Sequence, residues 1–330
     1  MHVALLTGGG DCAGLDTVVR TLTLSLLNRQ IQVTGIEQGY AGLMRHQWRA
    51  LSFSDVQTLS DVGGSLLGCH NRANPFADPD HGGTDVSAQV LAWARERRID
   101  GVVAIGGDGT LSIAARLHAL GLPHLVVPKT IDNDLAGTQG CVGFDTAVSV
   151  VTEALQRLRT TARSHGRVLI LHTMGRNTGW LALYAGIAAP ADVILLPELP
   201  IVQQHIVDLC RQRGASPGLG HTIICAAEAV DVEALREALA QALPCEVRSV
   251  RLGHVQRGGP PTATDRLLAT HLAHAAAQDA AARRFGHLIG WQGGRCRRVA
   301  FNSRHQWTRN VPTGHPLVQA AADLGVSLGQ

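Results

Sequence analysis

Short runs of apolar residues alternate with segments of helical periodicity along the chain. The apolar runs are continuous rather than alternating, which is typical of strands in a sheet that is covered on both faces. We predict strands at Val3–Leu6, Val102–Ile105, Leu125–Val127, Val168–Leu171, Val193–Leu196, Ile223–Ala226 and Val247–Leu252. Between them, apolar residues recur every three or four positions. This spacing predicts helices at Leu15–Asn28, 84–97, Leu111–Leu120, Asp145–Arg159, Ile201–Gln212 and Val232–Leu243.

The order of these elements indicates doubly wound α/β structure with mostly parallel sheets. A chain of 330 residues exceeds one ordinary hydrophobic core, so we expect two lobes. A boundary near residue 143 is plausible, because Gly-rich loops give way there to the helix that begins at Asp145.

Composition narrows the class of protein. The net charge of +3 is too small to indicate a nucleic-acid-binding protein. The 7 cysteines form no CxxC pair, which argues against a zinc site and favours reduced thiols in the cytoplasm. No apolar run approaches the roughly 18 residues of a membrane span. We therefore expect a cytoplasmic enzyme that binds small molecules.

The most informative segment is Pro128–Asp134, which follows a predicted strand. It presents Asp132 and Asp134 two residues apart, with Thr130 beside them. Another acidic turn, containing Asp108, follows the strand at Val102–Ile105. Carboxylates at two strand ends suit metal-assisted phosphoryl transfer, in which one acid holds magnesium and another accepts the proton of a hydroxyl group.

A glycine-rich loop, Thr7–Gly14, follows the first predicted strand and precedes a helix. Backbone N–H groups in such a loop can bind phosphate oxygens, although the segment can equally be a tight turn without a ligand. It matches neither the G-x-G-x-x-G pattern nor a Walker loop.

Together these motifs resemble the 6-phosphofructokinase family. The resemblance extends nearly end to end, to at least Arg266, and is most specific at Gly106–Thr110, Pro128–Asp134, Met174–Arg176 and Leu252–Gly259. It implies two doubly wound, mostly parallel α/β lobes with the active site in the cleft between them. The phosphoryl-donor lobe would comprise residues 1–143 and about 256–306. The sugar-phosphate lobe would comprise residues 144–255 and about 307–330.

The resemblance also implies the glycolytic reaction, in which ATP, with Mg²⁺ as cofactor, donates a phosphoryl group to the 1-hydroxyl of fructose 6-phosphate. Asp132 matches the catalytic base, with Arg176 and Thr130 also catalytic, and Asp108 positions the metal. The residues that match contacts to the phosphoryl donor are Gly10, Arg72, Gly107, Asp108, Gly109, Thr110 and Lys129. The residues that match contacts to the sugar phosphate are Thr130, Asp132, Asp134, Arg167, Met174, Gly175, Arg176, Glu228, Arg248, His254 and Arg257.

The roles implied for Arg72, Arg167 and Arg248 depend on loop length and on a neighbouring subunit. The loop that carries Arg72 varies in length within the family, so this arginine can instead be a solvated surface charge. In the family, the equivalents of Arg167 and Arg248 reach the substrate of a neighbouring subunit. We therefore expect a homodimer or homotetramer that binds neither nucleic acid nor membrane.

Two positions bear on the phosphoryl donor in opposite directions. Gly109 leaves room for a nucleotide, whereas Lys129 suits pyrophosphate, which carries more charge. We favour ATP; the alternative is a reversible pyrophosphate-dependent enzyme that also accepts sedoheptulose 7-phosphate. An NAD or lipid kinase would lack the motifs at 128–134 and 254–259, and a non-catalytic sensor would have lost Asp132 or Asp108. The chain departs from the family pattern at Ala13 and Asp16, where Pro and Asn are usual.

Overall fold

The computed structural model describes residues 1–59, 61–216, 220–301 and 306–330, which form two compact units. Unit 1 comprises Met1–Asp145 and Arg257–Thr308, and unit 2 comprises Thr146–Gln256 and Arg309–Gln330. The chain therefore leaves unit 1 after Asp145, returns at Arg257 and ends in unit 2. The segment expected to return to the first lobe includes residues 302–305, which lie outside the described residues.

Unit 1 contains a seven-stranded sheet with the order β11-β10-β5-β4-β1-β2-β3. Strands β10, β5, β4, β1 and β2 run parallel to one another, and the edge strands β11 and β3 run antiparallel to β10 and β2. The strands are β1 (His2–Thr7), β2 (Gln32–Ile36), β3 (Trp48–Ala50), β4 (Gly101–Gly106), β5 (His124–Pro128), β10 (His287–Gln292) and β11 (Arg295–Ala300).

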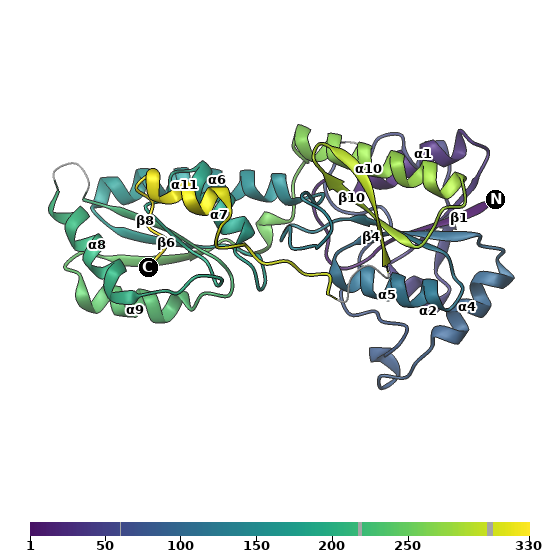
Figure 1. The fold of residues 1–330 in the computed structure, drawn as a ribbon, viewed down its shortest axis with the longest axis horizontal. Helices are drawn as coiled ribbons and strands as arrows, with labels where there is room; N and C mark the ends of the chain where they lie inside the picture. The colour runs from purple at the N-terminus through teal and green to yellow at the C-terminus, as the bar shows by residue number, and fades with distance from the viewer. Residues whose placement is uncertain (60, 217–219, 302–305) are drawn as a thin grey trace. The chain divides into compact units, whose positions relative to one another are not determined.

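Helices cover both faces of this sheet, with α1 and α10 on one face and α2, α4 and α5 on the other (Figure 1). Every residue of β4 and β5 is buried, which explains why these strands read as unbroken apolar runs. The helices are α1 (Leu15–Leu27), α2 (Tyr40–Arg45), α3 (Phe53–Val56), η1 (Pro79–His81), α4 (Ser87–Glu96), α5 (Asp108–Ala119) and α10 (Ala263–Ala281).

Unit 2 contains a four-stranded parallel sheet with the order β7-β8-β6-β9. Helices α6, α7 and α11 lie on one face, and α8 and α9 lie on the other (Figure 1). Its strands are β6 (Val168–His172), β7 (Val193–Leu195), β8 (Thr222–Ala226) and β9 (Val247–Arg251). Its helices are α6 (Phe144–His165), which begins in unit 1, α7 (Trp180–Ala188), α8 (Gln203–Ala215), α9 (Val232–Ala242), η2 (Gly253–Gln256) and α11 (Pro316–Asp323).

The predicted fold class, doubly wound and mostly parallel α/β, is confirmed. Every predicted strand and helix has a counterpart in the structure, with ends that shift by a few residues. The helix predicted to be capped by Thr84 or Asp85 has Val86 at its N-cap, while Asp85 Oδ1 accepts a hydrogen bond from the Ser87 N–H at 2.9 Å. Within the described residues, no helix combines the length and apolar character needed to cross a membrane.

A buried carboxylate holds the elements of the returning segment of unit 1 together. Asp279 on α10 accepts hydrogen bonds from Arg298 (2.7 Å), His287 (2.9 Å) and Arg284 (3.0 Å). Burial alone would raise the pKa of Asp279, but these hydrogen bonds bring it down to about 2. The carboxylate therefore stays charged at neutral pH and ties α10 to β10 and β11.

Candidate active site

Three loops of unit 1 meet at one edge of its sheet, because the strands before them are adjacent and parallel. Strands β5, β4 and β1 end in register, with Thr7 opposite Ile105 and Gly106 opposite Pro128. Their loops begin at Gly8, Gly107 and Lys129 respectively. In open α/β sheets, ligands bind outside the carboxyl ends of the strands.

Lys129 fixes the conformation of the glycine loop. Its side chain is 3% exposed, and its ammonium group donates hydrogen bonds to Gly8 O at 2.9 Å and to Gly10 O. The backbone bond from Gly8 N–H to Ile105 O, at 2.9 Å, joins the same loop to β4. The lysine predicted to contact the phosphoryl donor thus binds the loop that follows β1.

Thr110, predicted to contact the donor, is buried in the first turn of α5. Its side chain occupies the space that a Cβ atom would take at Gly8 or Gly106, so both positions require glycine. Asp108 is half-buried at the start of the same helix, where the positive end of the helix dipole favours a negative charge. A Cβ atom at Gly109 would meet nothing within 4 Å.

The loop after β5 places its two carboxylates differently. Asp132 is partly exposed, and its backbone N–H donates to Thr130 Oγ1 at 3.1 Å. Asp134 is buried, with 6% exposure. Asn133 between them has left-handed backbone, with φ 50°, and is buried. Asparagine adopts this conformation more readily than most residues other than glycine, which suits it to the turn between the two carboxylates.

Two arginines predicted as ligands lie near the glycine loop. Arg257 Nη1 donates to Asp11 O at 3.2 Å and would lie 2.5 Å from a Cβ atom at Gly10. The structure therefore places Arg257 with the glycine loop of unit 1, although it was predicted as a sugar-phosphate contact. Arg72 is exposed in a loop that pairs with the same segment through a parallel bridge between Gly8 and His70.

A second group of predicted residues gathers at the carboxyl ends of β6, β8 and β9 in unit 2. The Arg176 N–H donates to Glu228 Oε2 at 2.6 Å, and the Met174 N–H donates to Gln256 Oε1 at 3.1 Å. Gly175 and Arg176 have left-handed backbone, with φ 134° and 55°. His254 is exposed in η2, one turn after β9.

Gln256 is a residue to which sequence analysis gave no role. It is 1% exposed and also donates to Gly253 O at 2.9 Å, so it joins the Met174 loop to the turn that carries His254. Its position inside the Leu252–Gly259 motif is the one feature of the sequence that could have indicated this role. A buried amide that satisfies two backbone groups is consistent with a residue that positions others.

Arg167 and Arg248 lie apart from this group. Arg167 precedes β6 and Arg248 is the second residue of β9, so both lie at the amino ends of the strands. They share Glu246, with Arg167 Nε at 2.5 Å and Arg248 Nε at 2.6 Å from its carboxylate oxygens. A hydrogen bond from Arg248, together with the charge of Arg167, lowers the pKa of Glu246. The structure does not bring these two arginines to Met174, Glu228 and His254.

Comparisons with known proteins show the family to which the chain belongs. The family model for phosphofructokinase matches residues 2–280. The chain is 37% identical to ATP-dependent 6-phosphofructokinase 1 of Synechocystis sp., over 99% of this chain and 98% of that protein. It is 38% identical to the pyrophosphate–fructose 6-phosphate 1-phosphotransferase of Dictyoglomus thermophilum, over 81% and 83%. The structure of phosphofructokinase from Saccharomyces cerevisiae superposes with a TM-score of 0.82 and 28% identity, over 91% of this chain and 45% of the yeast chain.

The fold and the strand-end loops define an α/β protein of the kind that binds phosphorylated ligands. The chain belongs to the phosphofructokinase family, whose members are phosphotransferases with an alcohol acceptor. The resemblance predicted from its motifs is confirmed.

The buried carboxylate of Asp16 should make the stability of the protein depend on pH. It is 3% exposed in the first turn of α1, and its carboxylate oxygens accept the Leu66 N–H at 2.8 and 3.0 Å. Burial raises its pKa to about 6, against a smaller opposing effect of that hydrogen bond. Because its pKa is raised in the folded state, folding disfavours the charged carboxylate of Asp16. The contribution of neutral Asp16 to stability is therefore complete below about pH 4 and is lost as the pH rises through 6.

We therefore expect Asp16→Asn to stabilise the protein at pH 8 by up to about 2 kcal/mol. The amide oxygen can still accept the Leu66 N–H. The gain should shrink towards zero near pH 4, as measured by urea unfolding across this range. Asp323→Asn, at an exposed position, is the matched control. A gain that does not depend on pH would contradict the assignment.

Proposed function

We propose that this enzyme is a 6-phosphofructokinase that transfers the γ-phosphoryl group of ATP to the 1-hydroxyl of fructose 6-phosphate. The products are fructose 1,6-bisphosphate and ADP. The observation that carries the proposal is the meeting of three loops at one sheet edge of unit 1, which gathers Gly10, Asp108 and Asp132. The names of the relatives, which include this activity, support it.

Unit 1 supplies the groups suited to the phosphoryl donor. Backbone N–H groups at Gly10 and Gly107, and the positive end of α5, suit phosphate oxygens. Magnesium usually keeps several waters and binds one or two carboxylates together with substrate phosphates. Asp108, in the first turn of α5, is the carboxylate proposed to help hold such an ion. Such an ion supplies positive charge that neutralises the phosphates.

Asp132 is proposed to act as the general base. Its carboxylate accepts the proton of the 1-hydroxyl while that oxygen forms a bond to the γ-phosphorus. The bond from this phosphorus to the β–γ bridging oxygen breaks, and ADP leaves with the bridging oxygen and the electron pair of the broken bond. Thr130, whose hydroxyl accepts the Asp132 N–H, holds the base in place. Arg176 supplies positive charge for the transferring group.

Unit 2 supplies the groups suited to the sugar phosphate. Glu228 holds the backbone of Arg176 through one carboxylate oxygen, and Met174 is anchored by Gln256. Exposed His254 can donate to phosphate. Arginine recognises phosphate through paired N–H groups, which is the role proposed for Arg167 and Arg248 of unit 2 and for Arg257 of unit 1.

Two features of unit 1 favour ATP over pyrophosphate. The space around Gly109 is open, so a nucleotide would meet no side chain at that position. The ammonium of Lys129 is held by Gly8 O and Gly10 O, which gives it a role that does not depend on the donor. Lys129 therefore does not by itself indicate pyrophosphate as the donor. Relatives of both kinds have similar identity to the chain.

The base is tested by Asp132→Asn, with formation of fructose 1,6-bisphosphate from fructose 6-phosphate and ATP as the assay. We expect kcat to fall by about 10²–10⁴-fold, with KM for the sugar phosphate changed by less than about threefold, because only proton transfer is lost. Asp323→Asn is the control for loss of one carboxylate. A kcat within a few-fold of the wild-type value would exclude Asp132 as the base.

The nucleotide path is tested by Gly109→Asp. A carboxylate in the open space should crowd and repel the nucleotide phosphates, and we expect kcat/KM for ATP to fall by about 10²-fold, or about 2.7 kcal/mol. Gly314→Asp, at an exposed glycine where a Cβ atom also meets nothing within 4 Å, controls for the added charge. Equal ATP kinetics in the two variants would show that the nucleotide does not pass Gly109.

The position of Arg167 and Arg248, away from the other unit 2 residues, supports the proposal that they serve the substrate of a neighbouring subunit in a homo-oligomer. We expect Arg248→Ala and Asp132→Asn each to be nearly inactive alone. Co-expressed with different affinity tags and purified as mixed oligomers, they should recover activity, because each hybrid contains a site with both native residues. Mixed oligomers no more active than the separate variants would contradict this arrangement.

A further inference from the structure

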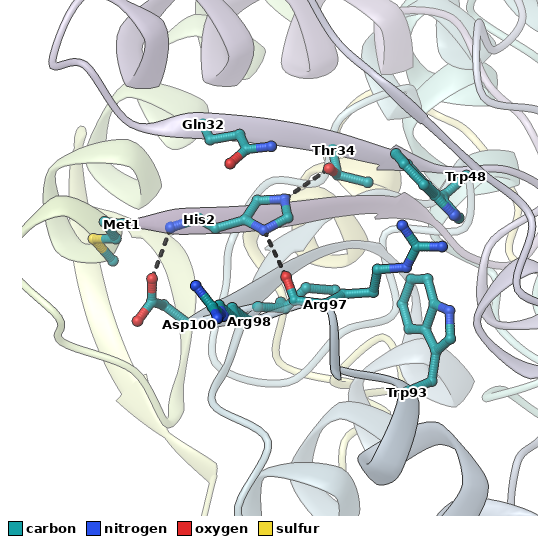
Figure 2. A pocket seen from close by; sticks show the side chains of 10 residues that line it. Met1, His2, Gln32, Thr34, Trp48, Trp93, Arg97, Arg98 and Asp100 are labelled. Atoms are coloured by element: carbon teal, nitrogen blue, oxygen red, sulfur yellow. Dashed lines mark hydrogen bonds between the residues drawn. The ribbon is translucent and has the colours of Figure 1, made fainter. Parts of the chain in front are cut away.

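A cavity of about 490 Å³ lies in unit 1 at the amino ends of β1, β2 and β4. It is lined by side chains from those strand ends, from β3 and from the end of α4 (Figure 2). The loops assigned to the phosphoryl donor lie at the carboxyl ends of β1 and β4. The lining also reaches further along the sheet, because Thr34 lies in the middle of β2 and Trp48 pairs with Ile36 at the carboxyl end of β2. Trp48 lies on the edge strand β3, which β2 separates from β1, and none of the residues that line the cavity belongs to the donor loops.

One wall of the cavity is aromatic. The Arg97 guanidinium lies over the Trp48 ring, 4.4 Å from its centroid, and Trp48 remains 37% exposed. Trp93 also lines the cavity, and its ring stacks on His46 with centroids 5.6 Å apart. Solvent-exposed indole and a stacked guanidinium both offer flat surfaces to a planar ring.

The charge of the lining is positive. Within the described part of the chain, neither Arg97 nor Arg98 forms an ion pair. The carboxylate of Asp100 is already engaged, since Oδ2 accepts the His2 N–H at 2.7 Å and Oδ1 accepts from Arg283 at 3.1 Å. Two guanidinium groups are therefore available to an anion, and arginine binds phosphate in a bidentate manner.

The polar part of the lining is held in place. His2 Nε2 is 2.7 Å from the Thr34 hydroxyl, and His2 Nδ1 donates to the carbonyl of Arg97 at 3.2 Å, as Figure 2 shows. The bond to Arg97 also gives a partner to a carbonyl group at the C-terminal end of α4. Such carbonyl groups carry partial negative charge and would otherwise repel an anion. The exposed amide of Gln32, at the start of β2, can donate and accept at the rim.

We propose that this cavity binds a planar aromatic ring that carries a phosphate group, of about the size of a nucleoside monophosphate. The ring packs against Trp48 and Arg97, and the phosphate is held by Arg98. The volume lies within the range of small-molecule sites and is too small for a polymer. Neither the ring alone nor the phosphate alone would use both the aromatic wall and the free arginine.

The test titrates AMP, and in parallel UMP, against the tryptophan fluorescence of the enzyme. We expect saturable quenching that is lost in Trp48→Phe, because this indole forms the wall. Arg98→Gln should raise the dissociation constant at least tenfold. Arg295→Gln, which removes an exposed arginine of β11 that does not line the cavity, should leave it unchanged.

Two further comparisons separate the cavity from the donor loops. Adenosine and ribose 5-phosphate should each bind at least tenfold more weakly than AMP, since each lacks one recognised group. KM for ATP should stay within about twofold in Arg98→Gln, which also shows that this variant is folded. Absence of saturable quenching, or an AMP dissociation constant that is the same in Arg98→Gln and the wild type, would overturn the proposal whatever the outcome of the kinase assays.

Discussion

The unit 1 site depends on one buried ammonium group. Burying an unpaired charge costs several kcal/mol, so the Lys129 ammonium, with 3% exposure, requires the carbonyls of Gly8 and Gly10 to face it. Lys129 follows β5 and the glycine loop follows β1, with β4 between these strands. The lysine therefore connects two loops across the end of a third strand and leaves the glycine loop little freedom to turn its carbonyls elsewhere.

Packing restricts the same loops further. Thr110 fills the space beside Gly8 and Gly106, and Arg257 fills the space beside Gly10, so a side chain at any of these glycines would displace a neighbour. A Cβ atom at Gly109, by contrast, would meet nothing within 4 Å. The glycine loop is thus rigid, while the space beside Gly109 stays unfilled. A phosphate site of this kind is preorganised, because the loop is ordered during folding and not when the ligand binds.

Sequence patterns predicted β1, β4, β5 and the four strands of unit 2, because strands covered on both faces consist of unbroken apolar runs. They did not predict the parallel strands β2 and β10 or the edge strands β3 and β11. They missed α7, whose nine residues are almost all apolar and so show no 3.6-residue period, and α10, where buried alanines give little contrast. Motifs singled out Asp108 and Asp132, and the family resemblance singled out Glu228; each follows a predicted strand, and their roles stay proposals. The contacts of Lys129 with Gly8 and of Arg257 with Asp11 join residues 121 and 246 positions apart, and only the three-dimensional fold brings them together.

The central claim is that this site transfers a phosphoryl group from ATP, with Lys129 serving the loop rather than the donor. Steady-state kinetics of the wild-type enzyme with fructose 6-phosphate and magnesium, supplied with ATP or with pyrophosphate in parallel, test it most directly. The account predicts a kcat/KM for ATP about two orders of magnitude greater than for pyrophosphate, or about 2.7 kcal/mol in transition-state stabilisation. A greater kcat/KM for pyrophosphate would contradict it and would return Lys129 to the role of a pyrophosphate ligand.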